Sequence, residues 1–335
     1  MSNTYEYVLS VVIVNWNTSE DLKTCLTSLT DRSGILNFEI IVVDNASEDD
    51  SVQMVRSKFP KVLLVANKVN LGFAAAVNQG INNACGKYLL ILNADIVSNF
   101  ESLQVLANTL ESRKDVGAVA PRLINLDGSL QRGYYRKLPT LMQILLFYTS
   151  LSKFTFKHPY LVKKYLEVYI EENATQFEVE QIPGGCIMIR RDVLQTVGLM
   201  DESFFLFFED VDWCYRIRKG GWRLLCLNDV SMIHKGGSSF LKLDSSIFYG
   251  RFLLSLNQFV DKHYSLMSRF LAKLFTICDS FIILIVRKLQ MVIKPQTMYG
   301  DSGKSYRKHK YYLKIFIDNY FPAIFSKLVK FILPG

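Results

Sequence analysis

The sequence predicts an α/β protein with a mostly parallel, Rossmann-like sheet flanked by helices and an amphipathic helical C-terminal extension. Short β-branched runs alternate with helical patterns through the first hundred residues, which is the order of open sheets with right-handed crossovers. Polar residues directly follow these runs, as at the carboxyl ends of strands where such sheets bind ligands. From about residue 246 the alternation stops and the chain becomes amphipathic and basic.

The expected elements follow one another along the chain. Residues 9–14 form a continuous apolar run that is typical of a buried parallel strand. A helix is then expected from Ser19, because Leu22, Cys25, Leu26 and Leu29 form an apolar stripe at helical spacing. Further strands are expected at residues 38–43, 62–65, 88–92, 186–189 and 222–227, and further helices at residues 47–59, 72–83 and after Asp210.

The segment 204–216 is the most informative stretch of the chain. Five apolar residues lead directly into Glu209, Asp210 and Asp212. One interpretation is a buried strand end followed by an acidic helix N-terminus. The other is a functional site, because carboxylates beside buried aromatic residues are costly unless they act on something. Helical spacing pairs Asp212 with Arg216, which leaves Asp210 to accept a proton from a hydroxyl group.

Composition and charge narrow the class of protein. The six cysteines are scattered without a CxxC pair, which favours reduced thiols in the cytosol. Positions 241–335 hold 15 basic and 5 acidic residues, whereas the first 240 positions hold 24 and 26. A near-neutral body with a basic, aromatic tail favours an anionic lipid surface, and no pattern typical of nucleic-acid binding is present. A solvated basic face is the alternative.

Polar residues at three strand ends suggest ligand binding. Asp44 follows an apolar run and is either a ligand for a pyrimidine base or ribose, or the N-cap of the helix expected from Ser47. Asn93 and Asp95 end another run and suit Mg²⁺ or Mn²⁺ held mainly by diphosphate and water. His234 is either a further metal ligand, which would favour Mn²⁺, or a structural histidine.

The helix start after Asn70 is a weaker signal. Gly72 and the alanines that follow it allow a phosphate or sugar to approach backbone N–H groups closely. Tight helix packing explains the same residues equally well.

Eight motifs, taken in order, resemble family 2 glycosyltransferases, and the last of them resembles a rhamnosyltransferase-like branch. The resemblance spans roughly residues 9–239, about two thirds of the chain. The motifs are Val11–Asn17 (VVIVNWN), Val42–Ser47 (VVDNAS), Asn70–Phe73 (NLGF), Leu92–Asp95 (LNAD) with Gly184–Gly185, Gly198–Glu202 (GLMDE), Phe208–Asp212 (FEDVD) and His234–Ser238 (HKGGS).

The resemblance implies a GT-A fold and an inverting, metal-dependent transfer of a sugar from a nucleotide donor. Asp210 matches the catalytic base, and Asp95 and His234 match ligands of Mn²⁺ or Mg²⁺. The first position of the family's DxD element is Asn93 here, which weakens the expected metal binding without removing it. The residues expected at the nucleotide sugar are Asn15, Asn17, Asp44, Asn45, Asn70, Gly72, Asn93, Ala94, Gly184, Gly185 and Glu209.

The same resemblance suggests the partners and the location. The donor is expected to be dTDP-rhamnose or a UDP-sugar, and the acceptor a saccharide or lipid-linked saccharide of a bacterial surface glycan. Residues 1–245 are expected to form the catalytic domain and residues 246–335 a basic helical region. This region is expected to contact the inner membrane from its cytoplasmic face or to form a homodimer, and an interfacial helix is favoured over a transmembrane one at residues 269–292.

Overall fold

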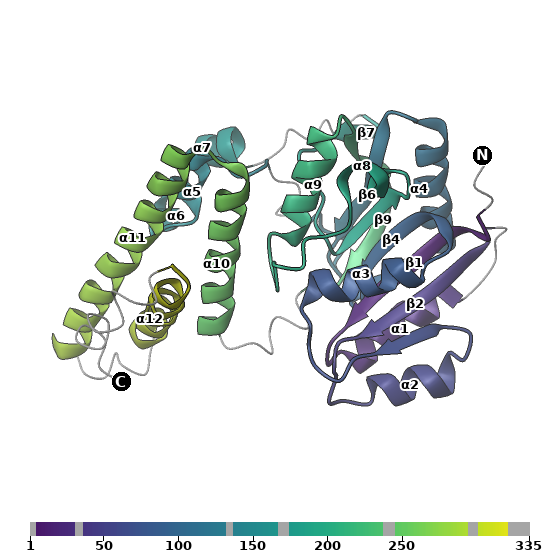
Figure 1. The fold of residues 1–335 in the computed structure, drawn as a ribbon, viewed down its shortest axis with the longest axis horizontal. Helices are drawn as coiled ribbons and strands as arrows, with labels where there is room; N and C mark the ends of the chain where they lie inside the picture. The colour runs from purple at the N-terminus through teal and green to yellow at the C-terminus, as the bar shows by residue number, and fades with distance from the viewer. Residues whose placement is uncertain are drawn as a thin grey trace. The chain divides into compact units, whose positions relative to one another are not determined.

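The computed structural model describes residues 5–30, 36–131, 137–166, 174–236, 245–293 and 301–320. The chain forms two compact units (Figure 1). The first unit comprises Met1–Leu138, Glu167–Phe205 and Glu209–Ser239, and the second comprises Pro139–Leu166, Leu206–Phe208 and Phe240–Gly335.

A single mixed sheet forms the centre of the first unit. Its strand order is β3-β2-β1-β4-β8-β6-β9-β5, and β7 pairs with β9. The strands β1 to β4 are parallel, β8 runs antiparallel between β4 and β6, and β6 and β9 are again parallel. The strands are β1 (Tyr7–Asn15), β2 (Phe38–Asp44), β3 (Leu63–Ala66), β4 (Gly86–Asn93), β5 (Ile96–Val97), β6 (Val116–Ile124), β7 (Gln176–Glu178), β8 (Cys186–Arg190) and β9 (Arg223–His234).

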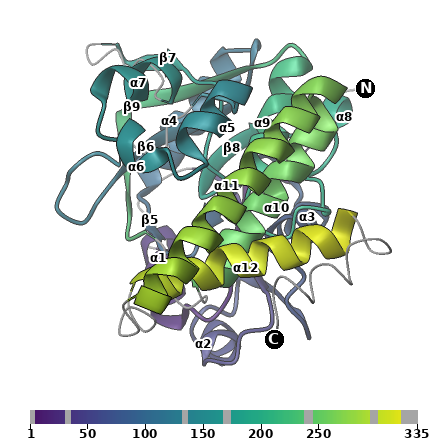
Figure 2. The ribbon, with the colours of Figure 1, turned by 90° about the vertical axis from the view of Figure 1, so that its left-hand side faces the viewer.

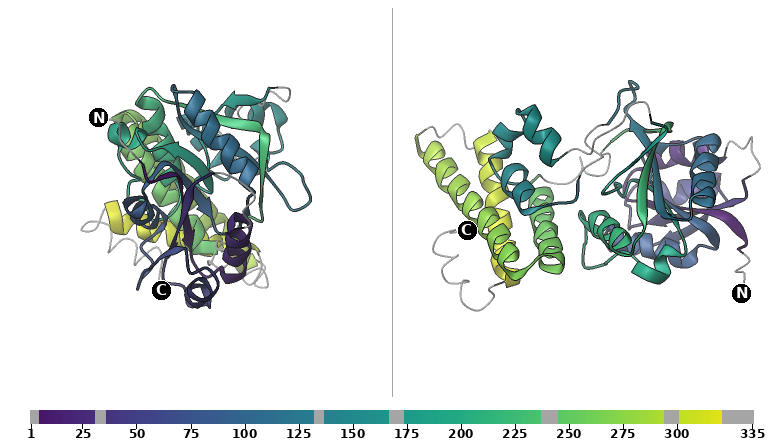
Figure 3. Two further views of the ribbon diagram at one scale, coloured as in Figure 1. Left: turned by 90° about the vertical axis from the view of Figure 1, so that its right-hand side faces the viewer. Right: turned by 90° about the horizontal axis from the view of Figure 1, so that it is seen from above.

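Helices cover both faces of this sheet (Figure 3). One core cluster joins the sheet to α1 (Ser19–Thr30), α2 (Ser51–Lys58) and α4 (Phe100–Ser112). The other joins it to α3 (Phe73–Asn83), α8 (Val193–Val197) and α9 (Glu209–Lys219). The apolar stripe expected on α1 is buried, and α3 ends where the sequence predicted. The predicted α/β class is therefore confirmed.

The structure corrects several element boundaries. The helix expected from Ser47 begins at Ser51, because residues 47–50 are held by side-chain hydrogen bonds that compete with helix formation. The strand expected at residues 222–227 is longer in the structure, where β9 continues to His234. The largely buried strand β6 and the helix α4 were not predicted.

The second unit is helical and has its own core. It contains α5 (Leu141–Phe147), α6 (Ser152–Thr155), α7 (Pro159–Tyr165), α10 (Ser245–His263), α11 (Leu266–Ile293) and α12 (Asp301–Tyr320) (Figure 2). The buried Tyr312 hydroxyl joins three of them, since it bonds Asn257 Nδ2 at 3.0 Å and Thr276 Oγ1 at 3.1 Å. Across the described parts of the chain, no helix has the length and apolar character needed to cross a bilayer.

Candidate active site

The parallel pairing brings the predicted strand-end residues to one edge of the sheet. Asn15 lies opposite Asp44 in the β1–β2 register, and Val14 lies opposite Asn93 in the β1–β4 register. The carboxyl ends of β1, β2 and β4 are therefore neighbours, which is where open α/β sheets bind ligands.

Asp44 is buried in a network of hydrogen bonds. Its Oδ1 accepts from Asn15 Nδ2 at 2.8 Å and from Ser47 Oγ at 2.6 Å, and its Oδ2 accepts from Ser47 N at 2.9 Å. Because α2 begins at Ser51 with Asp50 at its N-cap, the alternative of Asp44 as the N-cap of this helix is wrong. Asp44 instead fixes the turn after β2. Asn17 closes the same turn, since its Oδ1 accepts from Glu48 N at 2.7 Å.

Asn45 connects this network to the start of α3. Its side chain donates to Asn70 Oδ1 and to the Gly72 carbonyl, at 2.9 and 3.1 Å, and accepts from Leu71 N at 3.0 Å. Gly72 has φ +90°, and a Cβ added there would lie 2.6 Å from the Phe205 carbonyl oxygen. Glycine is therefore required at this helix start for two reasons, backbone conformation and close approach.

Asp95 and His234 face each other across β5 and β9. Ile96 pairs with His234, and the Lys235 N–H donates to the Asp95 carbonyl at 3.0 Å. His234 Nε2 lies 3.2 Å from Asp95 Oδ1, and both side chains are buried. Gln131 holds the other edge of the imidazole, since its Oε1 lies 2.9 Å from His234 Nδ1 and its Nε2 donates to the His234 carbonyl at 2.8 Å.

The Gly184–Gly185 pair links this group to Asp210. The Gly184 N–H donates to Asp210 Oδ2 at 2.7 Å, and the Gly185 carbonyl accepts from Asn93 N at 2.8 Å. A Cβ on Gly184 would lie 3.1 Å from Asp210 Cβ, and one on Gly185 would lie 2.9 Å from Asn93 Nδ2. Asp210, the two glycines and Asn93 thus form one continuous chain of contacts that leads to Asp95.

The two adjacent acids at the start of α9 have perturbed protonation. Burial raises the pKa of Asp210, and the N–H groups of Gly184 and Val211, which favour the ionised carboxylate, offset part of that rise. Burial, and then the charge of Asp210, raise the pKa of Glu209 well above its usual range. Perturbed carboxyl groups of this kind are typical of functional sites.

The apolar run before these acids is a turn, so the interpretation as a strand end is wrong. Phe207 and Phe208 both have positive φ, of 70° and 66°, a conformation that bulky residues rarely adopt. The predicted ion pair within α9 is confirmed, since Arg216 Nε donates to Asp212 Oδ2 at 2.8 Å. The buried Asp212 carboxylate is therefore paired with a guanidinium within the same helix.

Sequence reasoning missed the polar residues around Asp95. Gln131 lies in a segment without any motif, so nothing in the sequence pointed to its bonds with His234. Lys235 was noted only as part of a motif, yet its Nζ lies 2.7 Å from Asp21 Oδ1 in the first turn of α1. Spacing between such residues exceeds one hundred positions, and only the fold brings them together.

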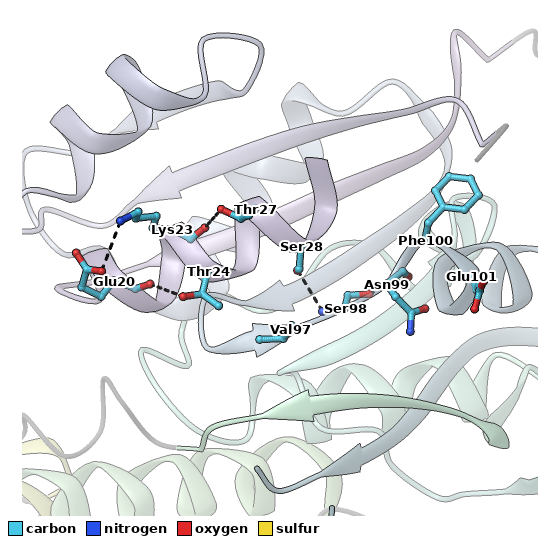
Figure 4. A pocket seen from close by; sticks show the side chains of 10 residues that line it. All are labelled: Glu20, Lys23, Thr24, Thr27, Ser28, Val97, Ser98, Asn99, Phe100 and Glu101. Carbon is cyan, nitrogen blue, oxygen red and sulfur yellow. Dashed lines mark hydrogen bonds and ion pairs between the residues drawn. The ribbon is translucent and has the colours of Figure 1, made fainter. Parts of the chain in front are cut away.

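A surface pocket of about 640 Å³ lies beside α1, β5 and the start of α4 (Figure 4). Hydroxyl, amide and carboxylate side chains line it together with Phe100. None of the predicted site residues is among them. The perturbed acids and the buried polar network lie instead at the strand ends.

The chain is similar to known proteins. The model of a family described as Glycosyl transferase family 2 matches residues 10–198. The N-acetylglucosaminyl-diphospho-decaprenol L-rhamnosyltransferase of Mycobacterium tuberculosis is 26% identical over 243 residues, which cover 68% of this chain and 76% of the relative. The dTDP-rhamnosyl transferase RfbF of Shigella flexneri is 23% identical over 236 residues, which cover 69% and 70%.

Two solved structures share the fold. The mannosyltransferase PcManGT from Pyrobaculum calidifontis, in complex with GDP-Man and Mn²⁺, has a TM-score of 0.52 and 16% identity, and the match covers 95% of this chain and 88% of that one. GalNAc-T7 with UDP, GalNAc and Mn²⁺ has a TM-score of 0.57 and 17% identity, with coverage of 96% and 59%. These likenesses confirm the expected GT-A type of fold.

Proposed function

Because the chain belongs to glycosyl transferase family 2 and is a glycosyltransferase, we propose that it transfers L-rhamnose from dTDP-rhamnose, with inversion, to a saccharide or lipid-linked saccharide acceptor. The observation that carries the proposal is the contact chain from Asp210 through Gly184 and Gly185 to Asn93, which connects a carboxyl group of raised pKa with the strand-end residues. The names of the relatives from M. tuberculosis and S. flexneri support rhamnose as the sugar.

Asp210 acts as the general base in this proposal. Its carboxylate accepts the proton of the acceptor hydroxyl while that oxygen bonds to the anomeric carbon. The bond from this carbon to the phosphate oxygen breaks, and its electron pair leaves with the nucleoside diphosphate. The raised pKa of Asp210 suits a base that works near neutral pH. Glu209, which precedes it, belongs to the nucleotide-sugar site in this proposal.

The strand-end network forms the donor site. Asn15, Asp44 and Asn45 hold the nucleoside, and the residues near the diphosphate are Asn93 and Ala94 with the helix start at Gly72. The internal bonds of Asp44 keep its position rigid, which reduces the entropy cost of donor binding.

The residues present fit a divalent metal ion. Two donor atoms that bind one octahedral Mg²⁺ or Mn²⁺ at adjacent positions lie about 3 Å apart, since the bonds are about 2.1 Å long. Asp95 Oδ1 and His234 Nε2 are separated by 3.2 Å. No cluster of three or more acidic, histidine or cysteine ligands occurs among the described residues, so diphosphate oxygens and water would complete the shell. A bound ion would neutralise charge on the leaving diphosphate.

The acceptor class suggests where the enzyme works. A lipid-linked saccharide, as in the name of the M. tuberculosis relative, would require the enzyme at the cytoplasmic face of the inner membrane, with the C-terminal helices as the contact. A UDP-sugar donor carrying galactofuranose or an N-acetylhexosamine is the alternative for the reaction. A catalytically silent scaffold and a homodimer through the helical unit are the alternatives of another class.

The test is the Asp210→Asn variant, which keeps the shape of the side chain and removes the base. We expect kcat to fall by roughly 10² to 10⁴, while donor affinity, measured by calorimetry, stays within about threefold. Asp229→Asn is the matched control, because it makes the same change at an exposed carboxylate on β9 and should leave kcat unchanged. Near-normal turnover by Asp210→Asn would refute the assignment of the base.

A further inference from the structure

An exposed segment of the second unit combines aromatic rings with lysines. It comprises residues 151–164, including α6 and most of α7, and we call it the lysine–aromatic segment. Phe154, Phe156 and Tyr160 are 74%, 50% and 62% exposed. The segment contains no acidic residue. Four exposed lysines accompany these rings: Lys153, Lys157, Lys163 and Lys164.

The backbone of this segment is anchored, so the exposed rings are presented by a defined structure. Ser150 N, just before the segment, donates to Asp279 Oδ1 of α11 at 2.9 Å. The buried Thr155 hydroxyl donates to the Leu146 carbonyl at 2.7 Å. Phe156 keeps one edge-on contact with Phe147, at 5.2 Å between centroids. Phe154 therefore stays exposed because of how its neighbours are fixed.

The helix α11 of the same unit carries a long exposed apolar stripe. Successive members are three or four residues apart, except for Leu274 and Ile282, which are eight apart, and this spacing places them on one side of a helix. Its members, each at least 40% exposed, are Met267, Phe270, Leu274, Ile282, Ile285, Leu289 and Val292. Asp279 on α11 accepts the bond from Ser150, and α5 also packs on α11, so the stripe and the lysine–aromatic segment belong to neighbouring parts of one unit (Figure 2).

We propose that the lysine–aromatic segment and the α11 stripe form a docking surface for anionic lipid headgroups. Aromatic rings beside lysines suit the bilayer interface, where the rings enter the headgroup layer and the ammonium groups reach phosphates. A symmetric pair built on this surface would gather the lysines of both copies in one interface that has no acidic residue from the segment, which disfavours a second copy as the occupant. The proposal deepens the proposed function, on which it rests for the lipid-linked acceptor.

Co-sedimentation of the full chain with lipid vesicles tests the surface. We expect binding to vesicles that contain phosphatidylglycerol, little binding to pure phosphatidylcholine, and weaker binding as salt rises from about 0.1 to about 0.5 M. Each lysine near the surface contributes about fivefold to the partition coefficient, so changing all four to Gln should lower it by more than about a hundredfold. Phe154→Ser with Phe156→Ser should lower it at least tenfold.

Matched variants in the first unit control for the loss of positive charge and for the loss of exposed apolar side chains. Four exposed lysines there, changed to Gln, remove the same charge: Lys58, Lys61, Lys68 and Lys219. Val105→Ser with Leu126→Ser removes exposed apolar side chains. Both controls should bind vesicles as the unchanged chain does. Equal losses in controls and segment variants would overturn the proposal, as would unchanged binding by the segment variants.

Two further readouts separate this proposal from the proposed function. Segment variants should keep their melting temperature and their turnover with a water-soluble acceptor. If they change sedimentation velocity instead of vesicle binding, the surface is a contact between copies and the lipid proposal fails. If Asp210→Asn keeps its turnover while vesicle binding behaves as expected, only the proposed function fails.

Discussion

At the scale of single residues, the site depends on two adjacent carboxyl groups in different environments. Asp210 is half-buried and accepts two backbone N–H bonds, so its ionised form has partners. Glu209 is buried, and its Oε2 has no hydrogen-bond partner among the described residues. A buried carboxylate without partners is expensive. The fold therefore keeps Glu209 protonated to higher pH than an exposed glutamate. The ionised form is better stabilised at Asp210, because two N–H groups donate to it.

The raised pKa of Glu209 makes the stability of the folded chain depend on pH. Because the pKa of Glu209 is raised in the folded state, the folded chain holds a proton that the unfolded chain has lost, and unfolding becomes easier as pH rises above the usual glutamate value. Glu209→Gln removes this penalty. We expect it to raise the free energy of unfolding by about 1 to 3 kcal/mol at pH 8, with a smaller gain near pH 5, measured by urea denaturation. A larger gain at the lower pH would contradict the assignment.

At the scale of elements, the start of α9 directly follows a strained turn. Its N-terminus receives the Gly184 N–H on Asp210, while the preceding turn contains the two positive-φ residues Phe207 and Phe208. The turn is stabilised by aromatic packing, since Phe252 of α10 lies 5.8 and 5.4 Å from those rings. Ser255 Oγ also donates to the Leu206 carbonyl at 2.8 Å. Packing therefore offsets the backbone strain of the turn.

Gly184 should be intolerant of any side chain. A Cβ there would lie 3.1 Å from Asp210 Cβ and 3.3 Å from Phe73 Cε1, so Gly184→Ala displaces Asp210, the proposed base. We expect kcat to fall at least tenfold, with a loss of stability of about 1 to 2 kcal/mol. Gly220→Ala meets Val197 Cγ1 at a similar 3.2 Å away from the site and is the matched control. Kinetics and thermal melts of both variants decide the matter; equal kcat in the two would exclude a positioning role for Gly184.

At the scale of the whole molecule, chemistry and surface properties are divided between two units. The first unit holds the strand-end network and the perturbed acids, and the second holds the lysine–aromatic segment and the α11 stripe. Residues 139–166 and 206–208 fall in the second unit although residues of the first surround them in the sequence. The two units are thus interleaved along the chain.

Nucleotide binding should stabilise the first unit. At a hundredfold its dissociation constant, a ligand adds about 2.7 kcal/mol, which corresponds to a shift of several degrees in Tm. We expect the largest shift with dTDP and Mn²⁺ and smaller ones with UDP or GDP, measured by thermal melts with and without the ion. A larger shift with UDP would favour the UDP-sugar alternative. The absence of a shift with every nucleotide would favour the scaffold.

The α/β class could be predicted from the sequence, because buried parallel strands are continuous apolar runs and α1 and α3 carry clear apolar periodicity. The sequence was informative at single residues too. It also indicated the strand-end residues Asp44 and Asp95, since polar groups that directly follow such runs lie at the sheet edge. It failed at the apolar run 204–208, where local β propensity is overridden by aromatic packing that creates a positive-φ turn.

Which of these residues lie together depends on the folded chain and could not be predicted from the sequence. Gln131 meets His234, and Gly184 meets Asp210, through contacts between segments that local patterns cannot relate. The protonation of Glu209 likewise depends on burial, which is a property of the packed core. Local patterns specify elements because they act over a few residues, whereas a site is specified by distances between elements that exist only once the sheet has formed.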